Sequence, residues 1–177
     1  MALDAFAEHG FDGIPTRELA NRAEVSTTTL FHHFASKEEL YAAAYDHAVS
    51  LAYAHYNAVV AGGASLADEL RRMLVAADTL LTERPAIALL SVRAQIDQQH
   101  RSMHLANRPA PAVTFRAAMV QRAIARGELT SADAVHVQRL LDVFLWGISV
   151  IGYEDASVRR ESIAALERFV AGGLTFK

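Results

Sequence analysis

The stretch 16–34, TRELANRAEVSTTTLFHHF, constrains the fold of this chain more than any other. Leu19 and Ala20 lie on one face of a short predicted helix, and Leu30 lies on the inner face of a second. A small residue such as Ala20 lets two helices cross closely, and Val25 offers an apolar side chain at the turn between them. This spacing predicts a helix-turn-helix, whose second helix can enter the major groove of DNA.

The flanking residues extend this pattern. Residues 2–13 have apolar side chains at helical spacing and glycines near their end, and Ser36 and Glu39 form a capping box at the head of a fourth helix. The whole run 2–46 resembles the DNA-binding domain of the TetR family of bacterial transcriptional regulators. The matching residues are Phe6, Gly10, Thr16, Leu19, Ala20, Ala23, Val25, Ser26, Thr29, Leu30, Phe31, His33, Phe34, Ser36, Lys37 and Glu38.

The rest of the chain also has the pattern of helices, and its abundant alanine favours them. We predict helices over 37–60, 65–84, 86–104, 112–126, 130–152 and 157–171, with a loop at 107–111. This order matches the nine-helix layout of the TetR family. The predicted fold is therefore all-α, with a helix-turn-helix domain over 1–36 and a ligand-binding and dimerisation domain over 37–177. A linker helix, 37–61, enters the second domain.

The recognition helix begins with short polar side chains. Thr27 and Thr28 occupy its first turn, where a hydroxyl can bond base edges and a methyl can contact thymine. The resemblance implies that His33 reaches a phosphate, whereas His32 is either a base contact or part of a solvated helix end. Lys37 stands in the first turn of its helix, where it can grip a phosphate together with free backbone N–H groups. The predicted DNA contacts are Arg17, Thr27, Thr28, Phe31, His32, His33 and Lys37.

The charge of this region argues against DNA binding. Residues 1–60 hold three Lys or Arg and eight Asp or Glu, a net charge of −5 with neutral histidines. DNA affinity depends on neutralising phosphates, and Glu24 stands where the family turn usually has glycine. Either the acidic residues face away from the duplex, or a basic arm that family members carry before the position of Met1 is missing. A rival hypothesis is a helical ligand-binding or enzymatic protein that has lost DNA binding.

The resemblance also implies a small-molecule pocket between the helices of the C-terminal domain. Its large apolar candidates share positions on the predicted inner faces, and Arg93 is a polar anchor among them. For each residue, a place in the core is the more common role. The predicted ligand-binding residues are Met73, Leu81, Arg93, Phe115, Met119, Val143 and Trp146, and their character predicts a mostly apolar ligand.

The helix predicted over 131–152 is apolar on almost every side after Leu140. Such a helix is buried on two faces, and in a chain of this size the second face suits a partner subunit. The final helix carries a complementary apolar stripe. The predicted homodimer interface contains Leu145, Ile148, Ile163, Leu166 and Phe169, and the alternative is a monomer with a deep core.

Several functional classes find little support. The chain has no cysteine, which excludes disulfides and thiolate chemistry, and its longest apolar run is too short for a membrane span. Asp97, His100 and His104 share a helical face, but their position at a helix end favours solvation over metal binding. We therefore expect a cytoplasmic protein with no catalytic site, metal or cofactor. The sequence predicts a TetR-like repressor released from a palindromic operator by a small ligand.

Overall fold

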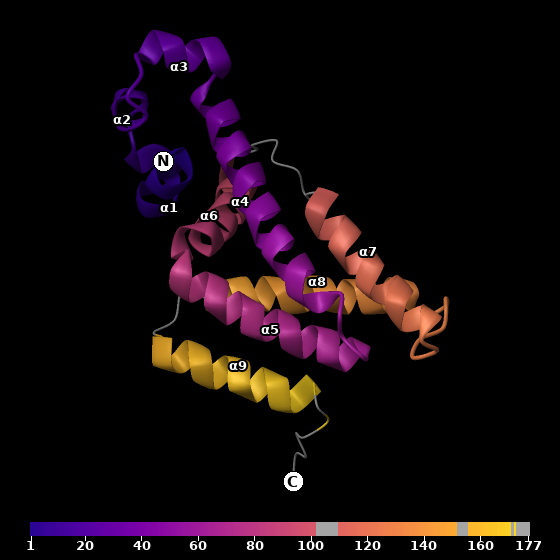
Figure 1. Cartoon of the computed structure of the whole chain (residues 1–177). Coiled ribbons are helices and arrows are strands. Elements are labelled where there is room, and N and C mark those ends of the chain that lie inside the picture. Colours follow the sequence, from indigo (N-terminus) through magenta and orange to yellow (C-terminus); the bar gives the residue numbers. More distant parts are fainter. Residues whose placement is uncertain (102–109, 152–155, 171, 173–177) are drawn as a thin grey trace.

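The computed structural model describes residues 1–101, 110–151, 156–170 and 172 (Figure 1). Within these ranges every regular element is a helix, which confirms the all-α class. The helices are α1 (Ala2–Gly13), α2 (Thr16–Arg22), α3 (Thr27–His33), α4 (Lys37–Val60), α5 (Leu66–Glu83), α6 (Pro85–Arg101), α7 (Ala110–Ala125), α8 (Ala134–Ile151) and α9 (Ala156–Val170). None of them, as far as their residues are described, is long and apolar enough to cross a membrane.

Capping side chains set where several helices begin. The hydroxyl of Ser36 accepts a hydrogen bond from the backbone N–H of Glu39 (3.1 Å), and Ser65 accepts one from Asp68 in the same way (3.1 Å). Pro85 is the first residue of α6, as expected for a residue that lacks an N–H. The loop predicted at 107–111 is too long, because α7 already begins at Ala110, and 107–109 lie outside the described residues.

The buried apolar side chains form two separate clusters. The first, here called the N-terminal core, joins α1–α3 to the first two thirds of α4, to α6 and to Leu80 of α5. The second, the C-terminal core, joins the end of α4 to α5, α7, α8 and α9. Figure 1 shows α4 running from the helix-turn-helix into the rest of the molecule. The two cores therefore share α4, and α6 packs against α1 as well as against α5.

Aromatic rings fix α1 against α4, and a hydrogen bond links α4 to α6. Tyr41 is fully buried, and its ring packs edge-on against Phe6 (4.8 Å between centroids) and Phe11 (5.3 Å). Its hydroxyl donates a hydrogen bond to the carboxylate of Asp97 on α6 (2.6 Å). This bond satisfies a hydroxyl that would otherwise be costly to bury, and it ties α4 to α6.

Ion pairs tie the helices of the C-terminal core together. Glu69 on α5 is fully buried and accepts hydrogen bonds from Arg122 (2.9 and 2.8 Å) and Arg126 (2.9 Å) on and beyond α7. Arg159 on α9 donates to Asp78 on α5 (3.1 Å). A buried carboxylate needs such partners because its charged form is poorly solvated in the interior.

Candidate nucleic-acid interface and effector region

The α2–α3 pair has the geometry of a helix-turn-helix. Leu19 (3% exposed), Ala20 (1%) and Leu30 (8%) form its inner face. Val25 was predicted to fill the turn, but it is 38% exposed. The turn is held instead by the backbone, because the N–H of Val25 donates to the carbonyl of Ala20 (3.0 Å).

Glu24 gives this turn an unusual backbone. Its φ of 56° lies in the left-handed region, which glycine adopts freely and a residue with a Cβ adopts at a cost. Its N–H donates to the carbonyl of Asn21 (3.0 Å), so the conformation is part of a hydrogen-bonded turn. Glu24 therefore stands where the family turn usually has glycine, and its backbone adopts a conformation that glycine favours.

The predicted contacts on α3 are all exposed. Thr27, Thr28, Phe31, His32 and His33 lie on a short helix that buries little besides Leu30. The N-terminus of α3 is capped by Ser26, whose hydroxyl accepts from the backbone N–H of Thr29 (2.9 Å). A helix with this many accessible side chains can dock against a large surface such as the DNA major groove.

The cations of the N-terminal region are placed differently from one another. Arg17 is exposed on the first turn of α2. Arg22 pairs with Glu18 (3.2 Å) and Glu8 (3.4 Å), which partly neutralise its charge. Lys37 is half-buried, with its ammonium 4.7 Å from the centroid of the Phe11 ring, and this burial lowers the pKa of Lys37 although the charge of Glu38 opposes the shift.

Four of the predicted ligand-binding residues lie together in the C-terminal core. Met73, Leu81, Phe115 and Met119 are 0–5% exposed and belong to one cluster. The other three lie elsewhere. Val143 and Trp146 on α8 are 70% and 54% exposed, respectively, and Arg93 faces α1.

Arg93 bridges α6 and α1. Its guanidinium donates to the carbonyl of Glu8 (3.4 Å), and a Cβ on Gly10 would stand 3.0 Å from it. Gly10 has a φ of 72°, and this kink in α1 makes room for the arginine. Arg93 therefore lies at the contact between α6 and α1, away from the cluster that contains Phe115.

The predicted dimer residues fall into two groups. Leu145 and Ile163 are 8% and 6% exposed and pack inside the C-terminal core of the single chain. Leu166 is half-buried and Phe169 is 56% exposed, whereas the side chain of Ile148 lies outside the described part of the structure. Among the side chains of α8 that the structure describes, the most exposed apolar ones are Leu140 and Val143, and we did not include either among the predicted interface residues.

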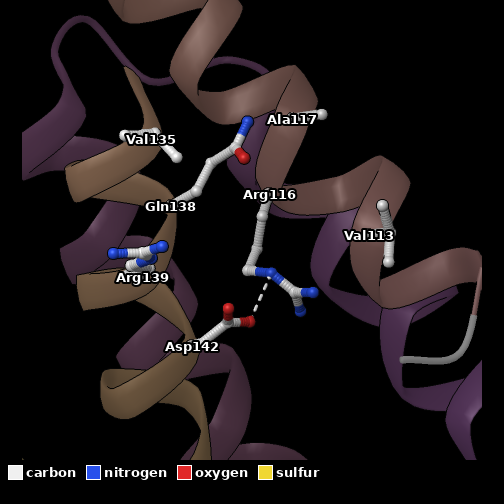
Figure 2. Close-up of a pocket in the computed structure, with 7 residues that line it drawn as sticks. All are labelled: Val113, Arg116, Ala117, Val135, Gln138, Arg139 and Asp142. Carbon is white, nitrogen blue, oxygen red and sulfur yellow. Dashed lines mark ion pairs between the residues drawn. The ribbon is translucent and has the colours of Figure 1, made fainter. Parts of the chain in front are cut away.

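A polar groove between α7 and α8 was missed by sequence reasoning (Figure 2). It has a volume of about 200 Å³ and is lined by Val113, Arg116, Ala117, Val135, Gln138, Arg139 and Asp142. Arg116 is only 7% exposed, and its Nε lies 2.7 Å from the Asp142 carboxylate. A signal existed in the sequence, because Arg116 lies on the same face of the predicted helix as Ala112, Val120 and Ala123.

Tyrosines from α4 also reach this part of the molecule. The ring of Tyr53 packs against Phe115 (5.3 Å) and Tyr56 (5.6 Å). Burial raises the pKa of Tyr53, and the nearby Arg116 opposes the shift.

The side chains of His100 and His104, considered above as metal ligands, lie outside the described residues. Among the described side chains, no group of three histidine or carboxylate residues could hold a metal ion.

Comparisons with known proteins agree with this geometry. Residues 1–44 match the family of bacterial regulatory proteins, tetR family, which confirms the resemblance of the N-terminal region. Salmonella enterica GusR has the same fold, with 24% identity, a TM-score of 0.74, and coverage of 98% of this chain and 91% of that one. A putative tetR family transcription regulator from Shewanella sp. PV-4 is 24% identical, with a TM-score of 0.68. The match covers 94% of this chain and 91% of that one.

The match extends to a ligand-bound regulator. FadR from Bacillus subtilis, in complex with stearoyl-CoA, is 13% identical, with a TM-score of 0.69 and coverage of 98% of this chain and 96% of that one. A search of curated proteins finds no match. The chain thus has the fold of TetR-family transcriptional regulators along almost its whole length.

Proposed function

We propose that this chain is a homodimeric transcriptional repressor that binds a palindromic operator and leaves it when a small, mostly apolar ligand binds. The observation that carries the proposal is α3, a capped helix whose Thr27, Thr28 and Phe31 are exposed beside α2. Residues 1–36 form the DNA-binding domain in this proposal, and 37–177 form the ligand-binding and dimerisation domain. The fold is that of transcriptional regulators, and we assign it no enzymatic role.

The proposed mechanism is a shift between two dimer conformations. A dimer reads two half-sites when its recognition helices stand about 34–36 Å apart, one turn of DNA. A ligand that prefers a different spacing lowers the population that fits the operator. Helix α4 belongs to both cores, so a movement of the C-terminal core is transmitted to the helix-turn-helix. FadR in complex with stearoyl-CoA is an example of this fold with a ligand that contains a long acyl chain.

Exposed apolar side chains support the homodimer. Leu140 and Val143 on α8 are 67% and 70% exposed, and Phe169 on α9 is 56% exposed. Large exposed apolar side chains on neighbouring helices are typical of an interaction surface. A two-fold axis would bring each patch against its own copy.

Genomic DNA selection followed by binding at several salt concentrations tests the proposal. A specific fragment should be enriched, and its affinity should fall linearly with salt on logarithmic axes. Lys37→Ala should weaken binding to all sequences and reduce the salt slope by about one unit per site, whereas Thr28→Ala should change sequence preference. Arg71→Ala, on the exposed side of α5, is the matched control. Unchanged affinity of Lys37→Ala would show that the docking geometry is wrong.

A second candidate function is ligand binding without DNA binding. It is favoured by the acidic charge of residues 1–60 and by the pairing of Arg22 with Glu18 and Glu8. In that case the selection would enrich no fragment, and any residual DNA binding would not depend on sequence. The same experiment therefore separates the two candidates.

A further inference from the structure

The groove between α7 and α8 contains a cation that is buried and already oriented. Arg116 extends from α7 toward Asp142 on α8 (Figure 2), with its Nε 2.7 Å from the carboxylate. The guanidinium has further N–H donors beyond the one at Nε. Because the side chain is 8% exposed, its rotamers are restricted, and a ligand would not have to order it.

The charges of the groove favour an anion. Arg116 and Arg139 contribute positive charge, and Asp142 alone contributes negative charge, so the lining has a net charge of +1. A carboxylate matches the planar fork of a guanidinium and can accept two parallel hydrogen bonds from it. Gln138 adds an amide that can bond either oxygen of such a group.

The volume of the groove and its apolar lining limit the size and polarity of the part of the ligand beyond the carboxylate. The volume of about 200 Å³ is below the roughly 300–1,000 Å³ of sites for drug-sized ligands. Val113, Ala117 and Val135 provide aliphatic contacts along the groove. The groove therefore suits one ring or a short chain better than a long acyl chain.

Trp146 extends this site on the α8 side. It follows Asp142 by four residues and Arg139 by seven, so the three share one face of the helix. Trp146 is 54% exposed, which leaves its ring available to stack on an aromatic ligand. Trp146 was predicted from the sequence to contact the ligand, and a ligand bound in this groove could contact it.

We propose that the α7–α8 groove is an effector site for a small aromatic carboxylate, held by Arg116 and Arg139 and stacked on Trp146. This inference rests on the proposed function, because it names the ligand class to which the regulator responds. The carboxylate would share Arg116 with Asp142. That sharing changes the α7–α8 contact at the ion pair that joins them.

The chain has a built-in reporter for this test, because Trp146 is its only tryptophan. Full-length protein is titrated with benzoate and phenylacetate while Trp146 fluorescence is followed. We expect a saturable change, with at least tenfold weaker binding of benzamide and of benzylamine. Arg139→Gln should weaken benzoate binding about fivefold or more, and the matched control Arg160→Gln, exposed on α9, should not.

A second variant tests the groove without touching its charges. Ala117→Leu adds bulk to a half-buried lining position and should abolish the response while the protein stays folded by circular dichroism. No saturable response in wild type, equal binding of benzylamine, or wild-type affinity in both Arg139→Gln and Ala117→Leu would overturn the proposal.

The same proteins are then tested on the selected DNA fragment. If DNA binds and benzoate does not, the groove proposal fails and the proposed function stands. If benzoate saturates the groove and no fragment is ever bound, the site stands and the DNA-binding function fails. Release of DNA by benzoate in wild type, but not in Ala117→Leu, supports both.

Discussion

The two halves of the molecule keep their charges in different places. In the helix-turn-helix half, the side chains of Arg22 and Glu18 are 37% and 47% exposed where they pair. In the C-terminal half, Glu69 is fully buried between Arg122 and Arg126. The first carboxylate pairs at the surface, whereas the second pairs from within the core.

This difference assigns different roles to similar residues. Exposed ion pairs contribute little to stability because water and salt screen them, although they still change the potential that DNA meets. A buried carboxylate that loses its partners, or buried arginines that lose their carboxylate, leave a charge unsolvated. Charge substitutions in the C-terminal half should therefore alter stability, and those in the N-terminal half should alter DNA affinity.

The largest effect is expected at Glu69. Glu69→Gln removes the carboxylate that Arg122 and Arg126 share, and breaking a buried pair of this kind costs about 3 kcal/mol. Urea unfolding measures the loss. Glu18→Gln, at the exposed pair of the other half, is the matched control and should change the free energy of unfolding far less. Equal losses in the two variants would remove the distinction between the halves.

The next effect concerns the exposed apolar surface of the C-terminal half. Val143→Glu and Phe169→Asp place a charge on side chains that are exposed in the single chain, so they should break the dimer without unfolding the subunit. Sedimentation at micromolar concentration should show monomers. Leu145→Glu is a poorer probe, because Leu145 packs in the core of its own chain and the substitution should unfold it. A wild-type protein that sediments as a monomer would contradict the dimer.

Local signals in the sequence predicted most of the fold. Ser36, Ser65 and Pro85 mark helix starts because each acts on the backbone within a few residues, and the structure has the expected helices there. The helix-turn-helix was predicted for the same reason, since Leu19 and Leu30 lie close in sequence. The capping geometry depends only on residues that are close together in the sequence.

The sequence was a weaker guide to which helix faces which. The predicted anchor Arg93 contacts α1, whereas Arg116 is the buried arginine that lines the groove between α7 and α8. The two look alike in sequence, since each stands between apolar residues of its helix. Their partners, Glu8 and Asp142, are 85 and 26 residues away, respectively, and only the packing of α6 and α7 brings them together.

A smaller effect is expected at Glu24 in the N-terminal half. Glu24→Gly relieves a left-handed backbone at a φ of 56° and should raise the free energy of unfolding by up to about 1 kcal/mol, because the greater freedom of glycine in the unfolded chain offsets part of the gain. Glu24→Gln keeps the strain and removes the charge. It should strengthen DNA binding at low salt and leave stability unchanged. If Glu24→Gln stabilises as much as Glu24→Gly, the charge and not the backbone is responsible.

The smallest effect concerns pH and Asp68, a half-buried carboxylate in the C-terminal half. Asp68 accepts hydrogen bonds from Arg72 (2.9 Å), the backbone N–H of Ala64 (3.1 Å) and Arg71 (3.0 Å). Hydrogen bonding from Arg72, followed by that from Ala64, lowers the pKa of Asp68 to about 2. Since the pKa is lower in the folded chain than in the unfolded one, the ionised form stabilises the fold above the ordinary pKa of 3.8.

This stabilisation should disappear as the pH falls from about 4 toward 2, because protons then bind the unfolded chain first. Asp68→Asn lacks the ionisable group, so its melting temperature should lie below that of wild type at pH 7, and the two should converge in that range. Asp46→Asn, an exposed carboxylate on α4, is the control and should follow wild type at pH 7. A gap between Asp68→Asn and wild type that stays constant down to pH 2 would mean that Asp68 acts as a neutral cap and that its charge contributes nothing.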